Sequence, residues 1–132
     1  MYKILFLLFS ITCFGQNNFE TDTNSKIAFA DSQLEAESIA IRDIKNNNIS
    51  IFIENNPSPI IYSSDKDFEK KFNIKFILQG CTSSKYAVNY NYIIFNFFLK
   101  SFDKKWIKEI RKDAVGFKNW KKHKNELTIL KF

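Results

Sequence analysis

The chain has 132 residues with a formal net charge of +6, and 45% of its residues are hydrophobic. This length fits one domain that is large enough to bury a core of its own. Two cysteines, one histidine and three glycines are too few for a disulfide framework, a structural zinc site or a glycine-rich phosphate loop. No carboxylate cluster has a metal-binding spacing either. We therefore expect neither a metal nor a cofactor.

The N-terminus has the pattern of a cleavable signal peptide over residues 1–15. Lys3 precedes an apolar run, and the small residues Cys13 and Gly15 stand at the −3 and −1 positions of a cut before Gln16. The run is shorter than the roughly 20 residues of a membrane-spanning helix. We expect export to the periplasm or the extracellular space, with no transmembrane span after cleavage. Two alternatives stay open: a buried N-terminal strand, and a lipoprotein acylated at Cys13.

The rest of the chain alternates helical and strand-like segments. The capping pair Ser32 and Glu35 marks a helix start, and three asparagines end that helix at 46–48. In chain order we expect a flexible N-terminus (16–25), an ambiguous segment (26–30), a helix to residue 45, a strand (49–53), a possible short strand (60–62), a helix (65–72), a strand (74–78), a helix (85–101), a helix (103–115) and a basic tail (118–132) with a possible edge strand at 127–130.

This order predicts one globular domain over residues 26–117 with an α/β or α+β fold. A strand–helix–strand unit normally makes its two strands parallel, so we expect a sheet of two to four strands covered by helices. The segment 85–102 is apolar on every side, which predicts a buried central helix. Its tyrosines, isoleucines and phenylalanines would also suit a pair of strands. In the helix over 103–115, Trp106 and Ala114 should face inward, and Gly116 should cap its C-terminus.

Positive charge is concentrated at the C-terminal end. Residues 100–132 hold eleven Lys and Arg against four acids, whereas residues 16–99 hold eight against ten. Such a surface could contact an anionic envelope component or an acidic protein, although a solvated helix face and tail would explain it as well. Aromatic residues among the bases are also typical of single-stranded nucleic-acid binders, but an exported protein has less reason to meet nucleic acid. The candidate binding residues are Lys104, Lys105, Lys108, Arg111, Lys112, Trp120, Lys121, Lys122, His123 and Lys124.

Cys81 is the one cysteine left after the expected cleavage. It follows a predicted strand and precedes a predicted helix, where helix N-terminal amides would stabilise a thiolate. A nucleophilic thiol also needs a base, and the only histidine is His123 in the C-terminal segment. Burial as a small apolar residue is the plain alternative for this thiol.

The acidic residues have structural explanations. Asp65, Asp67 and Glu69 lie in or near the first turn of a predicted helix, where acids stabilise the helix dipole. Asp103, Glu109 and Asp113 are interleaved with Lys and Arg and are expected to form i, i+4 pairs on one helix.

A set of short motifs resembles an uncharacterised family of small exported bacterial proteins. The motifs are DFEKKFNIKF at 67–76, Gly80–Cys81, Tyr90–Asn91, WIKEIRKD at 106–113, and Gly116. The resemblance covers roughly residues 65–117 and implies a shared fold and an exported location, with no known activity. Some members have a second cysteine shortly after the first, and residues 82–89 here contain none.

These patterns leave three hypotheses for function. The first is a small exported protein without enzymatic activity that binds through a basic C-terminal face. The second is a thiol-dependent enzyme or redox protein that uses Cys81. The third is a periplasmic immunity or inhibitor protein.

Overall fold

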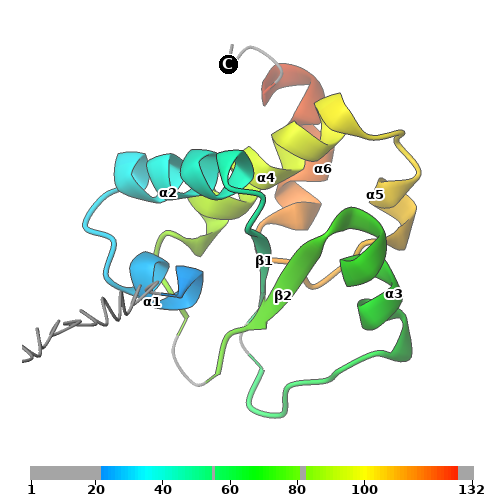
Figure 1. Cartoon of the computed structure of the whole chain (residues 1–132), viewed down its shortest axis with the longest axis horizontal. Helices are drawn as coiled ribbons and strands as arrows, with labels where there is room; N and C mark the ends of the chain where they lie inside the picture. The colour runs from blue at the N-terminus through cyan, green and yellow to red at the C-terminus, as the bar shows by residue number, and fades with distance from the viewer. Residues whose placement is uncertain (1–21, 55, 81–82, 128–132) are drawn as a thin grey trace, which may run out of the picture.

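The computed structural model describes residues 22–54, 56–80 and 83–127. The predicted signal peptide lies outside this range, as do Cys81 and most of the possible edge strand. The described helices and strands are α1 (Thr23–Ala28), α2 (Gln33–Lys45), β1 (Ile49–Ile53), α3 (Ser63–Phe72), β2 (Ile74–Leu78), α4 (Ala87–Ser101), α5 (Trp106–Glu109) and α6 (Phe117–Leu127) (Figure 1).

A two-stranded parallel sheet lies at the centre of an α+β fold. β1 and β2 pair from Ile49 opposite Ile74 to Ile53 opposite Leu78, and α3 connects them. Helices α2 and α4 pack beside β1, and α3 lies next to β2 (Figure 1). Every residue of β1 is buried, which is the burial expected of a strand with cover on both faces. The predicted strand–helix–strand unit, its two strands and its parallel pairing are confirmed.

The second edge of β1 is closed by side-chain and loop contacts. Val115 donates its backbone N–H to the Phe52 carbonyl at 2.9 Å, and Ala114 forms an antiparallel bridge with Ile53. Asn91, on α4 and fully buried, accepts the Phe52 N–H at 2.9 Å and donates to the Phe52 carbonyl at 2.8 Å. Its amide also donates to the Val115 carbonyl at 3.0 Å. These bonds satisfy backbone groups that an open strand edge would leave unpaired.

Helix α4 is the central helix that the sequence predicts. Tyr90, Ile94, Phe95 and Phe98 have no exposed surface, and they come from different sides of the helix. The Tyr90 hydroxyl donates to the buried Asp43 carboxylate at 2.9 Å and accepts the Ser50 N–H at 3.3 Å. Burial, and next the Asp43 carboxylate, raise the pKa of Tyr90, so it stays a neutral donor.

Helix α1 starts earlier than the sequence suggests. Thr23 belongs to the segment predicted to be flexible, yet it is buried and its hydroxyl donates to Asp43 at 2.9 Å. Ile27 on the same helix is 1% exposed and joins the core. A buried polar contact and an apolar anchor therefore hold a six-residue helix that is too short to be stable alone.

The predicted ends of α2 and the predicted C-terminal end of α3 are confirmed, whereas α3 begins at Ser63, before the predicted start at Asp65. Ser32 Oγ accepts the Glu35 N–H at 3.1 Å at the start of α2. Asn47, just after α2, and Asn73, just after α3, take positive φ angles of 54° and 50°, as expected for asparagine after a helix C-terminus. The possible short strand at 60–62 is absent, and its three side chains are largely exposed.

The predicted helix over 103–115 is wrong, because only α5 forms there. The backbone becomes extended at Ile110, with φ −64° and ψ 148°, and Ala114 and Val115 then pair with β1. Hydrogen bonds to the sheet edge take the place of those that a longer helix would make.

The predicted basic tail is also wrong for residues 118–127, which belong to α6. Gly116 precedes this helix and does not end the previous one. It has φ +76°, and a Cβ there would lie 2.7 Å from both Tyr92 and Val88 on α4. Glycine therefore allows both the left-handed turn and the close approach of the loop to α4.

Candidate binding surface

Lysines form a stripe along the outer side of α6. Lys118, Lys121 and Lys122 are exposed, whereas Phe117 and Trp120 are buried. Residues three and four positions apart are neighbours on a helix surface, so these lysines share one face. We call Lys118, Lys121 and Lys122 the α6 lysine stripe. Lys118 is absent from the sequence-based candidates, and the helical spacing of Phe117 and Trp120 would have identified it.

Trp120 anchors α6 to the core and is not a surface contact. It has no exposed surface, and its Nε1–H donates to Asn96 Oδ1 at 2.9 Å. Its ring centroid lies 5.4 Å from those of Phe95 and Trp106 and 6.0 Å from that of Phe117. The prediction that Trp120 lines the binding face is therefore wrong, because aromatic packing draws it inside.

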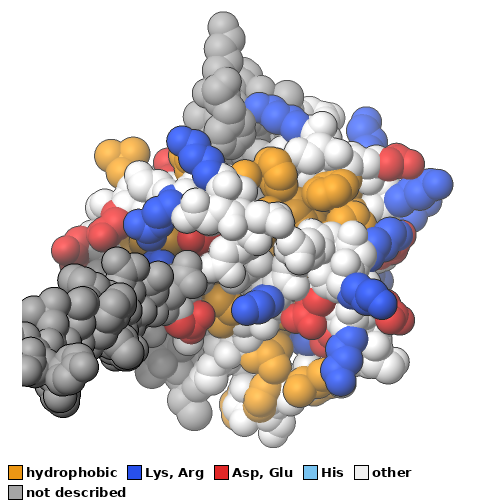
Figure 2. Space-filling model, viewed as in Figure 1, with side chains coloured by type: hydrophobic (Ala, Val, Ile, Leu, Met, Phe, Trp, Pro, Cys, Tyr) orange, Lys and Arg blue, Asp and Glu red, His pale blue; other side chains and the backbone are white. Residues whose placement is uncertain are grey.

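A second group of lysines surrounds α5. Lys104, Lys105, Lys108 and Lys112 are exposed, and we call them the α5 lysines. Figure 2 shows Lys and Arg side chains along the edge of the molecule over α5 and α3, with acidic side chains among them. Lys105 lies 3.8 Å from Asp103, with both side chains largely exposed. Such a pair adds little stability.

Arg111 is buried, so its predicted place on the binding face is wrong. Its guanidinium binds both carboxylate oxygens of Asp113, at 2.9 and 2.7 Å, and donates to Asp65 Oδ2 at 2.8 Å and to the Ile60 carbonyl at 2.9 Å. It also lies 4.7 Å from the centre of the Tyr62 ring. These contacts join the segment before α3 to the loop before α6.

The ion pairs around Arg111 shift two pKa values. Hydrogen bonding to Asp113 raises the pKa of Arg111, and hydrogen bonding from Arg111 lowers the pKa of Asp113. Both shifts favour the charged forms, as expected for a bidentate pair. The expected i, i+4 pairs within one helix are also wrong, because Asp113 pairs with Arg111 two residues away and Glu109 pairs with Lys71 on α3.

His123 and Lys124 are half-buried on the side of α6 between the stripe and the core. His123 Nδ1 lies 3.0 Å from the Asn119 carbonyl oxygen and donates to it. This bond holds the ring along its own helix. Cys81 lies outside the described residues, so the hypothesis of a reactive thiol with His123 as its base stays a prediction.

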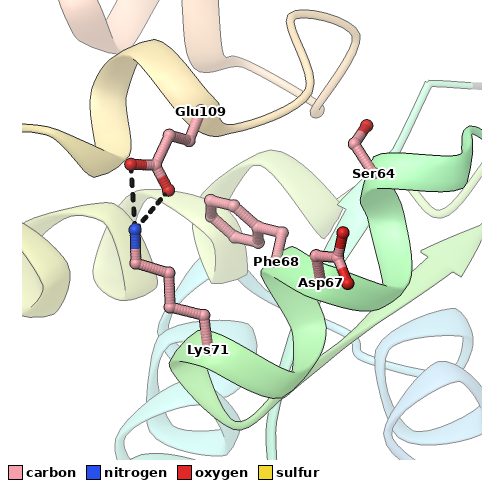
Figure 3. A pocket seen from close by; sticks show the side chains of 5 residues that line it. All are labelled: Ser64, Asp67, Phe68, Lys71 and Glu109. Atoms are coloured by element: carbon pink, nitrogen blue, oxygen red, sulfur yellow. Dashed lines mark hydrogen bonds and ion pairs between the residues drawn. The ribbon is translucent and has the colours of Figure 1, made fainter.

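A surface hollow of about 400 Å³ lies between α3 and α5, and its lining holds one cation, Lys71, against two carboxylates, Asp67 and Glu109. Lys71 donates to both carboxylate oxygens of Glu109, at 2.9 and 2.7 Å, beside the buried Phe68 ring (Figure 3). Ser64 lies at the other end of the hollow, well away from the ion pair (Figure 3).

Two further findings concern metals and membranes. Among residues 22–54, 56–80 and 83–127, no group of three or more His, Cys, Asp or Glu is placed to hold a metal ion. In the same described part of the chain, no helix is long and apolar enough to span a bilayer. The acidic residues near α3 have structural contacts instead: Asp65 accepts the Tyr62 N–H at 2.9 Å and Glu69 accepts the Phe76 N–H at 2.8 Å.

No protein-family model, curated protein or solved structure matches the chain. The resemblance to small exported proteins therefore stays a prediction. Several residues that carry it, including Tyr90, Asn91 and Trp106, are fully buried. They form the core and close the sheet edge, so a shared pattern at these positions would indicate a shared fold.

Proposed function

We propose that this protein is a small exported binding protein without enzymatic activity, which contacts an anionic partner through the α6 lysine stripe and the α5 lysines. The observation that carries the proposal is the contrast between the two sides of α6. One side presents Lys118, Lys121 and Lys122 to solvent, and the other is held in the core by Phe117 and Trp120. The charges are therefore displayed on a fixed helix.

The spacing of the stripe favours joint action of its charges. Lys118 and Lys122 are four residues apart, which is about 6 Å along a helix at 1.5 Å per residue. That separation is below the Debye length of about 8 Å at physiological ionic strength, so an approaching anion experiences the charges together. An acidic protein or an anionic envelope component would be attracted in this way. The attraction should weaken as salt is added.

The export half of the proposal rests on the sequence. Residues 1–15 have the composition of a signal peptide, and cleavage before Gln16 would remove Lys3 and leave a net charge of +5, one less than +6. The described fold begins at α1, downstream of that cut. Intact mass of the protein secreted by its host would test the proposal, because retention of residues 1–15 would contradict it.

Binding to immobilised heparin, used as a polyanion probe, tests the lysine surface. We compare the wild type with the triple variant Lys118→Glu, Lys121→Glu, Lys122→Glu, and read the salt concentration that elutes each protein. The control is the triple variant Lys66→Glu, Lys70→Glu, Lys75→Glu, which makes the same charge change at three exposed residues of α3 and β2.

We expect the stripe variant to elute at clearly lower salt than the control variant, because local charges dominate once distant ones are screened. Equal elution of the two variants would show that only net charge matters and would refute the proposed surface. Wild-type elution that does not depend on salt would refute the electrostatic basis.

A further inference from the structure

An apolar groove lies between the C-terminal ends of α2 and α4. Ile41 and Ile44 from α2 and Phe97 from α4 form its walls, and its volume is about 280 Å³. Lys45, Lys100 and Ser101 complete its lining. Figure 2 shows hydrophobic side chains on the face over α4, with Lys or Arg side chains at their border. The groove is thus lined by hydrocarbon and edged by cations.

The charge of this groove distinguishes it from two other hollows in the described part of the chain. The hollow between α3 and α5 contains Asp67 and Glu109, and the hollow beside α1 contains Glu35. In both, carboxylates offset the cations. No carboxylate lines the groove between α2 and α4.

Lys45 is not needed to satisfy the carbonyls of Arg42, Asp43 and Ile44 at the end of its own helix. Cations near a helix C-terminus often bind its last carbonyl groups. Here the carbonyls of Arg42, Asp43 and Ile44 already accept backbone N–H groups of Asn46, Asn48 and Asn47 at 2.9 to 3.1 Å. The Lys45 side chain is exposed, so its ammonium can meet an anion at the groove.

We propose that the groove binds a single-chain anionic amphiphile, such as a medium- or long-chain carboxylate. Its head group would lie at Lys45, and its hydrocarbon chain would lie along Ile41, Ile44 and Phe97. The groove volume is near the lower end of the range for ligand pockets, about 300 Å³. A single chain suits this space better than a two-chain lipid.

Aromatic rings continue the apolar path beyond the groove. The Phe97 ring lies 6.3 Å from that of Phe102, and the Phe102 ring lies 5.2 Å from that of Phe72. Phe102 is 37% exposed. A chain that leaves the groove therefore has further apolar surface to cover, so affinity should keep rising with chain length.

Calorimetric titration of the purified protein with hexanoate, octanoate and decanoate, each below its micelle concentration, tests the proposal. Burial of each CH₂ group should tighten binding up to about fourfold. Methyl NMR should show the largest shifts at Ile41 and Ile44. Octanol, the neutral control, should bind about two- to fivefold more weakly than octanoate, as an exposed ion pair allows.

The variant Lys45→Gln should lose most of that preference for octanoate over octanol, whereas Lys66→Gln on α3 should keep it. Lys45 and Lys66 are both exposed, so neither change should disturb folding. Four outcomes would overturn the proposal: affinity that is independent of chain length, equal binding of octanol and octanoate, methyl shifts elsewhere, or binding to phosphatidylglycerol vesicles but not to the monomeric carboxylates. Loss of heparin binding would leave this groove unaffected, so the two proposals fail separately.

Discussion

The substitution Asn91→Leu should destabilise the protein strongly, although it replaces a polar side chain with an apolar one of similar size. Asn91 has no exposed surface and makes three hydrogen bonds to the backbone beside β1. Leucine cannot accept the Phe52 N–H or donate to the Val115 carbonyl. The Phe52 carbonyl would keep its bond from the Val115 N–H. The change therefore leaves two backbone groups without their partners.

The size of the effect follows from the burial of those two groups. A buried polar group without a partner costs about 1–3 kcal/mol. Phe52 is fully buried and should incur the whole cost, whereas Val115 is half-buried and water can satisfy part of its carbonyl. We expect a loss of about 2–4 kcal/mol in the free energy of unfolding, which is a large fraction of a typical domain's stability.

Urea unfolding followed by tryptophan fluorescence measures this loss, because Trp106 and Trp120 are both fully buried. A loss of this size should lower the urea midpoint by about 1–3 M for a domain of this length. The control Asn125→Leu changes an exposed asparagine on α6 and should shift stability by less than about 0.5 kcal/mol. Equal midpoints for Asn91→Leu and the wild type would refute the view that Asn91 closes the sheet edge.

Two further predictions concern the loop before α6. Gly116→Ala should lower the melting temperature by about 8 °C or more. The left-handed backbone would cost an alanine about 1–2 kcal/mol, and the contacts of its Cβ with Tyr92 and Val88 would cost about as much again or more. An unchanged thermal unfolding curve would contradict this prediction. Arg111 lowers the pKa of Asp113 in the folded protein below its ordinary value of 3.8. The ionised Asp113 should therefore stabilise the fold above that pH, and this stabilisation should disappear as the pH falls through the lowered pKa of the folded state. The stability gap between wild type and Asp113→Asn, measured by urea unfolding, should therefore shrink below about pH 4, and a gap that grows in acid would show the opposite sign.

The sequence by itself determined the elements whose signals are local. The two strands were predicted at residues 49–53 and 74–78, as the structure has them. Ser32, Asn47 and Asn73 act at helix ends through their own side chains or backbone angles, which neighbouring residues hardly alter. The central helix was predicted because apolar residues on all its sides require burial whatever the neighbours are.

Only the tertiary structure decided the C-terminal third. Helical spacing at 103–115 indicated which residues could face inward, but not that Ala114 and Val115 would pair with β1. The spacing in this segment also placed Arg111 among exposed lysines. Its partner Asp65 lies 46 positions earlier, and no local pattern reveals such a contact.

Long-range contacts likewise decide which lysines belong to the proposed binding surface. Charge counts located the lysines, but they could not distinguish a basic tail from a basic helix. Packing of Trp120 against Phe95 and Trp106 decides that difference, because it fixes which side of α6 faces the solvent. Sequence therefore determined the charge and the local elements, and long-range contacts determined which charges are displayed.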